Sequence, residues 1–339
     1  MKKISIILVC FMFLITGLLC GCSNNQKDEN YVTIKLNEVT HSIFYAPLYV
    51  AINNGYFEEE GIKIELTNGG GADKVMTAIL SGDADIGLMG PEAAIYVTEG
   101  GANDRPVVFG QLTKRDGSFI VSKTNIENFT LNDLVGKEII GGRKGGVPAM
   151  TLQYAINQAG LEIGTDSNKV NLRTDVAFDL TASVFDSTDA EFCTLFEPTA
   201  SELCAQKGYH IVASVGELSG EVPYTAFTAK KGFIENNKNT VERFLRAVYR
   251  GYRFLLKANV SEIAKSLKPS FSSISDESII TSINSYINAD AWVSSPVMQE
   301  SAFDKLQDII IAAGELDSKV KFSDVVDTTI AKRVVEYFQ

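Results

Sequence analysis

The stretch that decides the fold runs from residue 32 to residue 89. It contains three short apolar runs, VTIKL (32–36), IKIEL (62–66) and IGLM (86–89). The first two alternate apolar and polar residues as strands do, and the third is typical of a buried strand. Helical patterns lie between them, one opened by Pro47 and one starting near Val75. Because a strand–helix–strand order places successive strands in parallel, the sequence predicts an α/β lobe.

A second unit is predicted to begin near residue 118. A capping-box pattern at 130–133 predicts a short helix, and a glycine-rich loop at 141–146 leads into a longer helix from 148 to 159. Strands are expected at 138–140, 169–172, 191–195 and 210–213. A last strand at 224–229 precedes a tail of helical periodicity. A helical tail with no strands of its own is expected to pack back on the first lobe.

The N-terminus has the pattern of an export signal. Lys2 and Lys3 precede an apolar run that ends at Leu19, which is shorter than a membrane-spanning helix and is followed by small residues. The sequence LCGC (19–22) resembles the lipobox of bacterial lipoproteins, with Cys22 as the lipidated residue. The predicted division is a signal peptide at 1–21 and a polar, flexible tether at 22–30. An ordinary cleaved signal and an uncleaved anchor remain the alternatives.

Charge and composition exclude several classes of partner. Removal of Lys2 and Lys3 with the signal takes the net charge from −11 to −13, which disfavours nucleic acid and anionic lipid as ligands. Only Cys193 and Cys204 lie beyond the signal and tether, and their spacing fits neither a redox CxxC motif nor a zinc site. Because only two histidines are present, a multi-histidine metal site is not expected. We expect neither a metal nor a cofactor.

Four segments carry a resemblance to a known family. They are APLYVAINNGYFEEEGI (46–62), SGDADIG (81–87), FEP (196–198) and PYTAFTAKK (223–231). Over residues 31–260 the chain resembles ABC-transporter substrate-binding proteins of the nitrate, sulfonate, taurine and thiamine-pyrimidine-precursor class. The first of the four signatures is the most specific.

The resemblance implies a periplasmic-binding-protein type II fold, an α/β architecture of two lobes with mixed sheets. Lobe 1 would comprise residues 31–117 and 224–339, and lobe 2 residues 118–223. Two crossover hinge segments would join them near 113–122 and 221–227, with the ligand held between the lobes. The function implied is capture of a small polar nutrient for an ABC permease and its ATPase. Together with the lipobox, the Lys/Asn/Ile-rich composition suggests lipid anchoring on the surface of a Gram-positive cell, and a monomer is the default expectation.

The loop that follows the first strand is the leading candidate for ligand contact. It contains Glu38, His41, Phe44 and Tyr45, which offer a hydrogen-bond acceptor and rings that could stack on a ligand. Phe44 and Tyr45 could instead close the base of the next helix.

Further candidates lie at loops and helix starts that face the cleft. Backbone N–H groups at such starts favour anions or carbonyl oxygens. Glu92 could instead stabilise the first turn of its helix, and Asp116 could serve the hinge turn. Arg143 and Lys144 are read as solvated. The remaining predicted ligand-binding residues are Gly70, Gly90, Glu92, Asp116, Gly146, Glu197 and Tyr224.

The balance of charges among these candidates favours one ligand class. Four carboxylates and few arginines favour a donor-rich ligand such as an aminopyrimidine over nitrate or a sulfonate. A sulfonate-, taurine- or nitrate-binding protein is the alternative within the class, and a surface sensor would have the same site. An enzyme resembling a thiamine-pyrimidine synthase is disfavoured, because the chain lacks that branch's cysteine cluster and any evident catalytic constellation.

Overall fold

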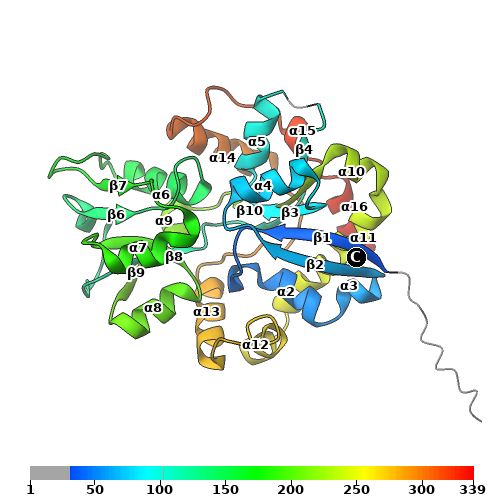
Figure 1. Ribbon diagram of the computed structural model, residues 1–339, viewed down its shortest axis with the longest axis horizontal. Coiled ribbons are helices and arrows are strands. Elements are labelled where there is room, and N and C mark those ends of the chain that lie inside the picture. Colours follow the sequence, from blue (N-terminus) through cyan, green and yellow to red (C-terminus); the bar gives the residue numbers. More distant parts are fainter. Residues whose placement is uncertain (1–30, 102) are drawn as a thin grey trace, which may run out of the picture. The chain divides into compact units, whose positions relative to one another are not determined.

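The computed structural model describes residues 31–101 and 103–339 (Figure 1). The predicted signal peptide, the lipidation site Cys22 and the tether lie outside the described residues. Within them, no helix has both the length and the apolar character that a membrane span requires.

The first sheet is mixed and has the order β2-β1-β3-β10-β4. Its strands are β1 (Val32–Glu38), β2 (Ile62–Asn68), β3 (Ile86–Met89), β4 (Pro106–Thr113) and β10 (Thr225–Lys230). The first three are parallel, as their alternation with helices predicted, and β10 inserts antiparallel between β3 and β4. Three helices follow β1, β2 and β3 in turn, namely α2 (Ala46–Asn53), α4 (Ala72–Ser81) and α5 (Glu92–Glu99).

The second sheet is also mixed, with the order β7-β6-β8-β5-β9. Its strands are β5 (Ser118–Ser122), β6 (Glu138–Ile140), β7 (Asn171–Arg173), β8 (Phe192–Phe196) and β9 (His210–Ser214). The helices around it are α6 (Val147–Gln158), α7 (Thr181–Ser187), α8 (Thr199–Lys207) and α9 (Val215–Ser219). Two mixed sheets with flanking helices confirm the predicted fold class.

The chain passes between the sheets twice. It leaves the first sheet after β4 and enters the second at β5, and it returns between α9 and β10. At the first passage the chain runs against the aromatic core, since a Cβ atom on Gly117 would lie 2.5 Å from the ring of Phe44. Glycine is required there because no side chain fits.

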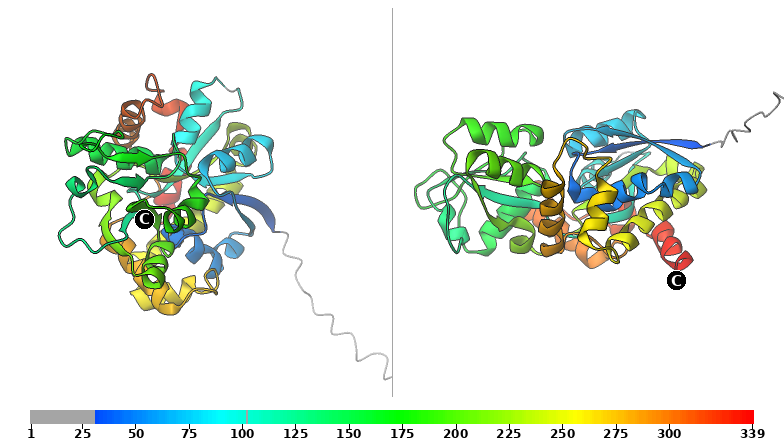
Figure 2. Two further views of the ribbon diagram at one scale, coloured as in Figure 1. Left: turned by 60° about the vertical axis from the view of Figure 1, so that its left-hand side comes forward. Right: turned by 90° about the horizontal axis from the view of Figure 1, so that it is seen from below.

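The C-terminal helices cover more than the first sheet. As expected, α11 (Lys238–Leu255) packs on α2, and α16 (Thr329–Tyr337) packs on α11 and β4. However, α13 (Asp276–Asn288) contacts α8, and α14 (Glu300–Ala312) contacts α6. Figure 2 shows the gold helix α13 between the green elements of the second sheet and the blue elements of the first. The tail therefore contacts the elements around both sheets.

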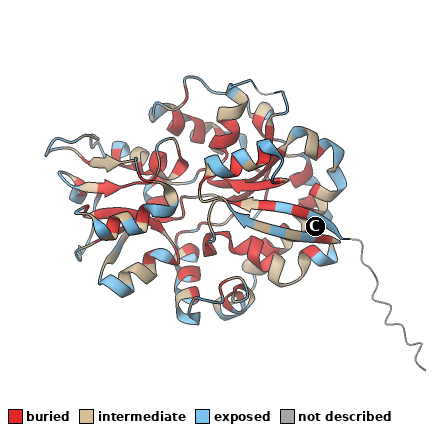
Figure 3. Ribbon diagram, in the orientation of Figure 1, coloured by how far each residue is buried: buried red, intermediate tan, exposed pale blue. Residues whose placement is uncertain are grey.

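Burial follows the sheets and the inner faces of the helices (Figure 3). Strands β3, β4 and β5 are buried along their whole length. Edge strand β2 alternates buried or half-buried residues with exposed ones, as the polar positions of IKIEL predicted. Cys193 is buried, Cys204 is half-buried, and neither forms a disulfide.

Candidate functional site

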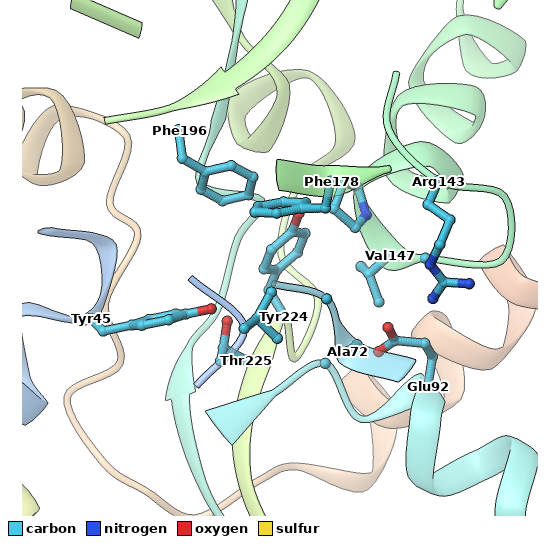
Figure 4. Close-up of a pocket in the computed structure, with 14 residues that line it drawn as sticks. Tyr45, Ala72, Glu92, Arg143, Val147, Phe178, Phe196, Tyr224 and Thr225 are labelled. Carbon is cyan, nitrogen blue, oxygen red and sulfur yellow. The ribbon is translucent and has the colours of Figure 1, made fainter. Parts of the chain in front are cut away.

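A cavity lies where loops from both sheets converge (Figure 4). The first sheet contributes residues after β1, at the start of α4 and at the start of α5, while the second contributes the start of α6 and two phenylalanines. The lining residues are Val39, Tyr45, Gly71, Ala72, Gly90, Glu92, Arg143, Gly146, Val147, Pro148, Phe178, Phe196, Tyr224 and Thr225.

Position within the fold explains why these residues meet. The parallel strands β1 and β3 end at the same edge of the first sheet, and the loops after them carry Val39 and Gly90 into the cavity. Pro148 opens α6 within its first turn, where proline is compatible with a helix. Ligands of open α/β sheets sit at the carboxyl ends of strands for this reason.

Glu92 is the one carboxylate among the described residues that line this cavity. Its side chain is 2% exposed, and its Oε2 atom has no hydrogen-bond partner in the part of the chain that the structure describes. Burial raises the pKa of Glu92 to about 7, against the opposing effect of nearby backbone N–H groups and of the Arg143 charge. The carboxylate folds back over Gly90, where a Cβ atom would lie 2.0 Å from Oε2.

Arg143 points toward Glu92 at the right of the cavity in Figure 4. Its side chain is 40% exposed, and its Nε lies 3.4 Å from Asp73 Oδ1. The positive charge of Arg143 thus lies beside both the cavity and the Asp73 carboxylate at its rim. The sequence-based interpretation of Arg143 as a solvated side chain therefore missed its position at the site.

Aromatic rings and hydroxyls form the rest of the wall. The rings of Phe178 and Phe196 have centroids 5.5 Å apart and cover the upper side of the cavity in Figure 4. Tyr45 points its hydroxyl at Thr225, whose side chain forms a hydrogen bond with it. Burial raises the pKa of Tyr224 well above its ordinary value, and the nearby Asp116 carboxylate adds to this effect. The site therefore combines apolar faces with a few polar groups, which is typical of small-molecule pockets.

The structure brings five of the eleven predicted ligand-binding residues to the cavity wall. They are Tyr45, Gly90, Glu92, Gly146 and Tyr224. Six others do not line it, namely Glu38, His41, Phe44, Gly70, Asp116 and Glu197.

Glu38 lies in a hydrogen-bonded cluster behind the cavity. Its carboxylate accepts a hydrogen bond of 2.5 Å from the Tyr49 hydroxyl and one of 2.9 Å from His41 Nδ1. The other ring nitrogen of His41 lies 2.8 Å from the backbone oxygen of Ser270. Because both ring nitrogens face acceptors, chiefly the Glu38 carboxylate, the pKa of His41 is raised. Burial raises the pKa of Glu38.

Asp116 is fully occupied at the first passage between the sheets. It accepts hydrogen bonds from the Ser118 backbone N–H, at 2.7 Å, and from the Thr151 hydroxyl. Burial raises the pKa of Asp116 to about 6, while these bonds oppose the rise. The alternative that Asp116 serves the hinge turn accounts for these contacts.

Glu197 caps helix α8. Its carboxylate accepts from the backbone N–H and the hydroxyl of Ser201, at 3.0 and 2.7 Å, and from the Ser285 hydroxyl at 3.0 Å. Its backbone oxygen accepts from Ser42, in the loop after β1, at 2.6 Å. Glu197 thus ties α8 to α13 and to the first sheet.

Phe44 and Gly70 lie next to the site without lining it. Phe44 is fully buried, with its ring 5.1 Å from that of Tyr286, so it fills the base of α2 as the alternative reading expected. Gly70 adopts a positive φ of 73°, and its neighbour Gly71 lines the cavity instead.

Several lining residues could not be singled out from the sequence. Phe178 lies in a segment with no motif, and Val39, Val147 and Pro148 are apolar residues of ordinary type. For Phe196 a signal was present, because it precedes Glu197-Pro198 in one of the family signatures. Among the described residues, no group of three or more His, Cys, Asp or Glu side chains could hold a metal ion.

Comparison with known proteins gives a consistent result. The family model described as NMT1/THI5 like matches residues 43–259, which is more than half of the chain. The chain is 38% identical over 310 residues to "Putative binding protein YtlA" of Bacillus subtilis (strain 168), with 91% of this chain and 92% of that protein covered.

Two solved structures share the fold. The periplasmic nitrate-binding protein NrtA from Synechocystis PCC 6803 superposes with a TM-score of 0.72 at 15% identity, covering 91% of this chain and 89% of that one. The alkanesulfonate-binding protein SsuA from Xanthomonas axonopodis pv. citri, bound to MOPS, gives 0.69 at 15% identity, covering 88% and 98%. Both are binding proteins of the predicted architecture. The family signatures in the sequence are thus confirmed, and the chain belongs to the NMT1/THI5-like family.

Proposed function

We propose that this protein is an extracytoplasmic substrate-binding protein of an ABC importer, which captures a small polar organic nutrient and performs no chemistry on it. The observation that carries the proposal is the cavity, because its wall combines side chains from the elements around both sheets. A ligand in it would touch both halves and stabilise their closed arrangement, which a permease could then recognise. Family membership and the 38% identity to a protein named as a binding protein support this function.

Three contacts join residues 118–223 to the rest of the described chain near the cavity. The Tyr96 hydroxyl on α5 donates to the backbone oxygen of Gly145 at 3.0 Å. Lys144 lies 3.6 Å from Glu315, and Lys74 lies 3.8 Å from Asp179. We propose that residues 31–117 with 224–339 form one lobe, that 118–223 form the other, and that these contacts join them when the ligand is enclosed.

For the ligand we propose a flat ring that carries both a hydrogen-bond donor and an acceptor, with an aminopyrimidine as the leading class. A carboxyl group with a pKa near 7 is partly protonated at neutral pH, so Glu92 can offer an acceptor and a donor side by side. An amino group next to a ring nitrogen matches that pair. The Phe178 and Phe196 rings offer faces for stacking.

A sulfonate, taurine or nitrate ligand is the second candidate, and Arg143 is the observation that favours it. The guanidinium faces the cavity and could hold an anion in a bidentate manner. Against an anion stands Glu92, which would lie beside it in a buried site. NrtA and SsuA are named for binding nitrate and alkanesulfonate, and their names support only this second candidate.

We further propose that Cys22 carries a lipid, that the body is tethered to the outer face of a Gram-positive cell membrane, and that the partners are an ABC permease and ATPase. Intact mass of the membrane-extracted protein would test the anchor. A mass equal to the chain from Cys22 plus acyl groups supports it, and the mass of the chain without lipid contradicts it.

The decisive experiment for the function is ligand-induced thermal stabilisation of the full chain in mild detergent. The panel contains aminopyrimidines, thiamine, taurine, alkanesulfonates and nitrate, and each hit is titrated by calorimetry. A ligand at a hundredfold its Kd adds about 2.7 kcal/mol to the free energy of unfolding. Glu92→Gln should weaken an aminopyrimidine hit, whereas Glu336→Gln, at an exposed position on α16 (Thr329–Tyr337) outside the cavity wall, should not. An anionic hit that Glu92→Gln strengthens would favour the second candidate.

A further inference from the structure

A second cavity adjoins the ligand site and has a different lining. It lies between α7, the start of α8 and the loop after β1. It shares Pro148, Phe178 and Phe196 with the ligand cavity, so the two spaces meet at the phenylalanine pair. We call it the threonine cavity after four of its lining residues, Thr40, Thr181, Thr194 and Thr199.

Two buried threonines line this cavity. Thr194 on β8 is only 6% exposed, and its hydroxyl forms no hydrogen bond within the described residues. Thr181 is 4% exposed and has one long bond, 3.5 Å, to the backbone oxygen of Ala177. A hydroxyl that faces a cavity and has no strong protein partner can form a hydrogen bond with a ligand. A threonine hydroxyl can both donate and accept, which suits hydroxyl and amide groups.

Charges around the threonine cavity argue against an ionic occupant. Asp179 lines it and is shared with Lys74 at 3.8 Å, so its carboxylate has a counterion already. At the start of α8, the Ser201 backbone N–H is taken by the Glu197 carboxylate at 3.0 Å. An anion would meet the Asp179 carboxylate here, and a cation would compete with Lys74 for it. These charges favour an uncharged occupant.

We propose that the threonine cavity is a second subsite, which binds an uncharged arm bearing a hydroxyl or amide on a ligand whose head occupies the cavity beside Glu92. The rings of Phe178 and Phe196, 5.5 Å apart, pack around the part of the ligand that joins head to arm. Thr194 forms the main hydrogen bond to the arm. This inference rests on the proposed binding function and adds to it the form of the ligand.

The test compares ligands with and without an arm in two head classes. The first pair is 4-amino-2-methylpyrimidine and its 5-(2-hydroxyethyl) derivative, and the second is ethanesulfonate and 4-hydroxybutanesulfonate. Kd values are measured by calorimetry on the full chain, on Thr194→Val and on Thr228→Val. Thr228 is the matched control, because it is a buried threonine whose hydroxyl also has no partner among the described residues, and it lines neither cavity.

In at least one pair, the arm should tighten binding about tenfold in the unmodified chain and in Thr228→Val. Thr194→Val should remove most of that gain without changing the Kd of the armless probe, because valine keeps the shape and loses only the hydroxyl. An arm that adds no affinity, or a gain that survives Thr194→Val, overturns the subsite while leaving the binding function intact. Failure of all four probes to bind overturns the subsite together with both ligand classes.

Discussion

Glu38 and Glu92 are buried carboxylates at the ends of neighbouring parallel strands of the first sheet, yet their surroundings differ completely. Glu38 ends β1 and accepts hydrogen bonds from Tyr49 and His41. Glu92 follows β3 at the start of α5, lines the cavity and keeps Oε2 without a partner in the described chain. The two are alike in burial, at 1% and 2% exposed. Hydrogen-bond partners, and not the degree of burial, therefore distinguish a carboxylate that stabilises the fold from one that is available to a ligand.

The comparison extends to Asp116 and Glu197, which belong with Glu38. Each accepts hydrogen bonds from two or more protein groups, and none of the three lines the ligand cavity. Three of the four carboxylates on which the aminopyrimidine prediction was based are therefore occupied within the protein. The support for a donor-bearing ligand comes down to Glu92 alone.

The largest effect should come from Glu38→Ala. The substitution leaves the buried Tyr49 hydroxyl and the His41 ring without their acceptor, so the free energy of unfolding should fall by about 3 kcal/mol. Urea unfolding at pH 7 measures the change. Glu38→Gln, which keeps an acceptor oxygen, should lose less. A loss below about 1 kcal/mol for the alanine variant would show that the Glu38 carboxylate does not stabilise the fold.

Glu92→Gln should have the opposite sign and depend on pH. Because burial raises the pKa of Glu92 from 4.5 to about 7, the folded state favours the protonated carboxyl. Its contribution to stability is fully present below pH 4.5 and is lost as the pH rises through 7. The neutral glutamine escapes that loss, so the ligand-free variant should be more stable than the parent by about 3 kcal/mol at pH 8, and by nearly nothing at pH 4.

Thermal unfolding of the ligand-free protein at pH 4, 6 and 8 measures this difference. Glu315→Gln is the control, since Glu315 pairs with Lys144 at 3.6 Å and lies outside the cavity wall. A Glu92→Gln variant that is equally destabilised at every pH would mean that the carboxylate has a structural partner. In that case the contrast with Glu38 would fail.

The smallest effect is expected at the rim of the cleft. Lys74 lies 3.8 Å from Asp179, with the two side chains 53% and 50% exposed. Exposed pairs contribute little, so Lys74→Ala should cost about 0.3 kcal/mol in low salt, and nothing measurable in 1 M NaCl. The measurement is urea unfolding at both salt concentrations. A salt-resistant loss above 1 kcal/mol would show that the rim pairs hold the ligand-free lobes together.

Local patterns in the sequence predicted much of the fold. The alternating run VTIKL and its two successors gave three parallel strands, and Pro47 and Pro148 each lie in the first turn of a helix. The site was harder to predict, because the same residue types can either line the cavity or fill the core. Tyr45 lines the cavity and the adjacent Phe44 fills the core, although the two stand together in one loop.

By itself, the sequence determined the family, the α/β class and the edge of the sheet at which the site lies, since strand periodicity and family signatures are properties of neighbouring residues. Only the tertiary structure decided which carboxylates have partners. Asp116 accepts a hydrogen bond from Thr151 and Glu197 accepts one from Ser285, while His41, the partner of Glu38, bonds to Ser270. Each of these partners lies far along the chain from the carboxylate concerned. The same is true of the threonine cavity, where Thr40 from the first unit meets Thr194 from the second. Hydrogen bonds depend on distances in space, and those distances are set when the two sheets and the C-terminal helices pack together.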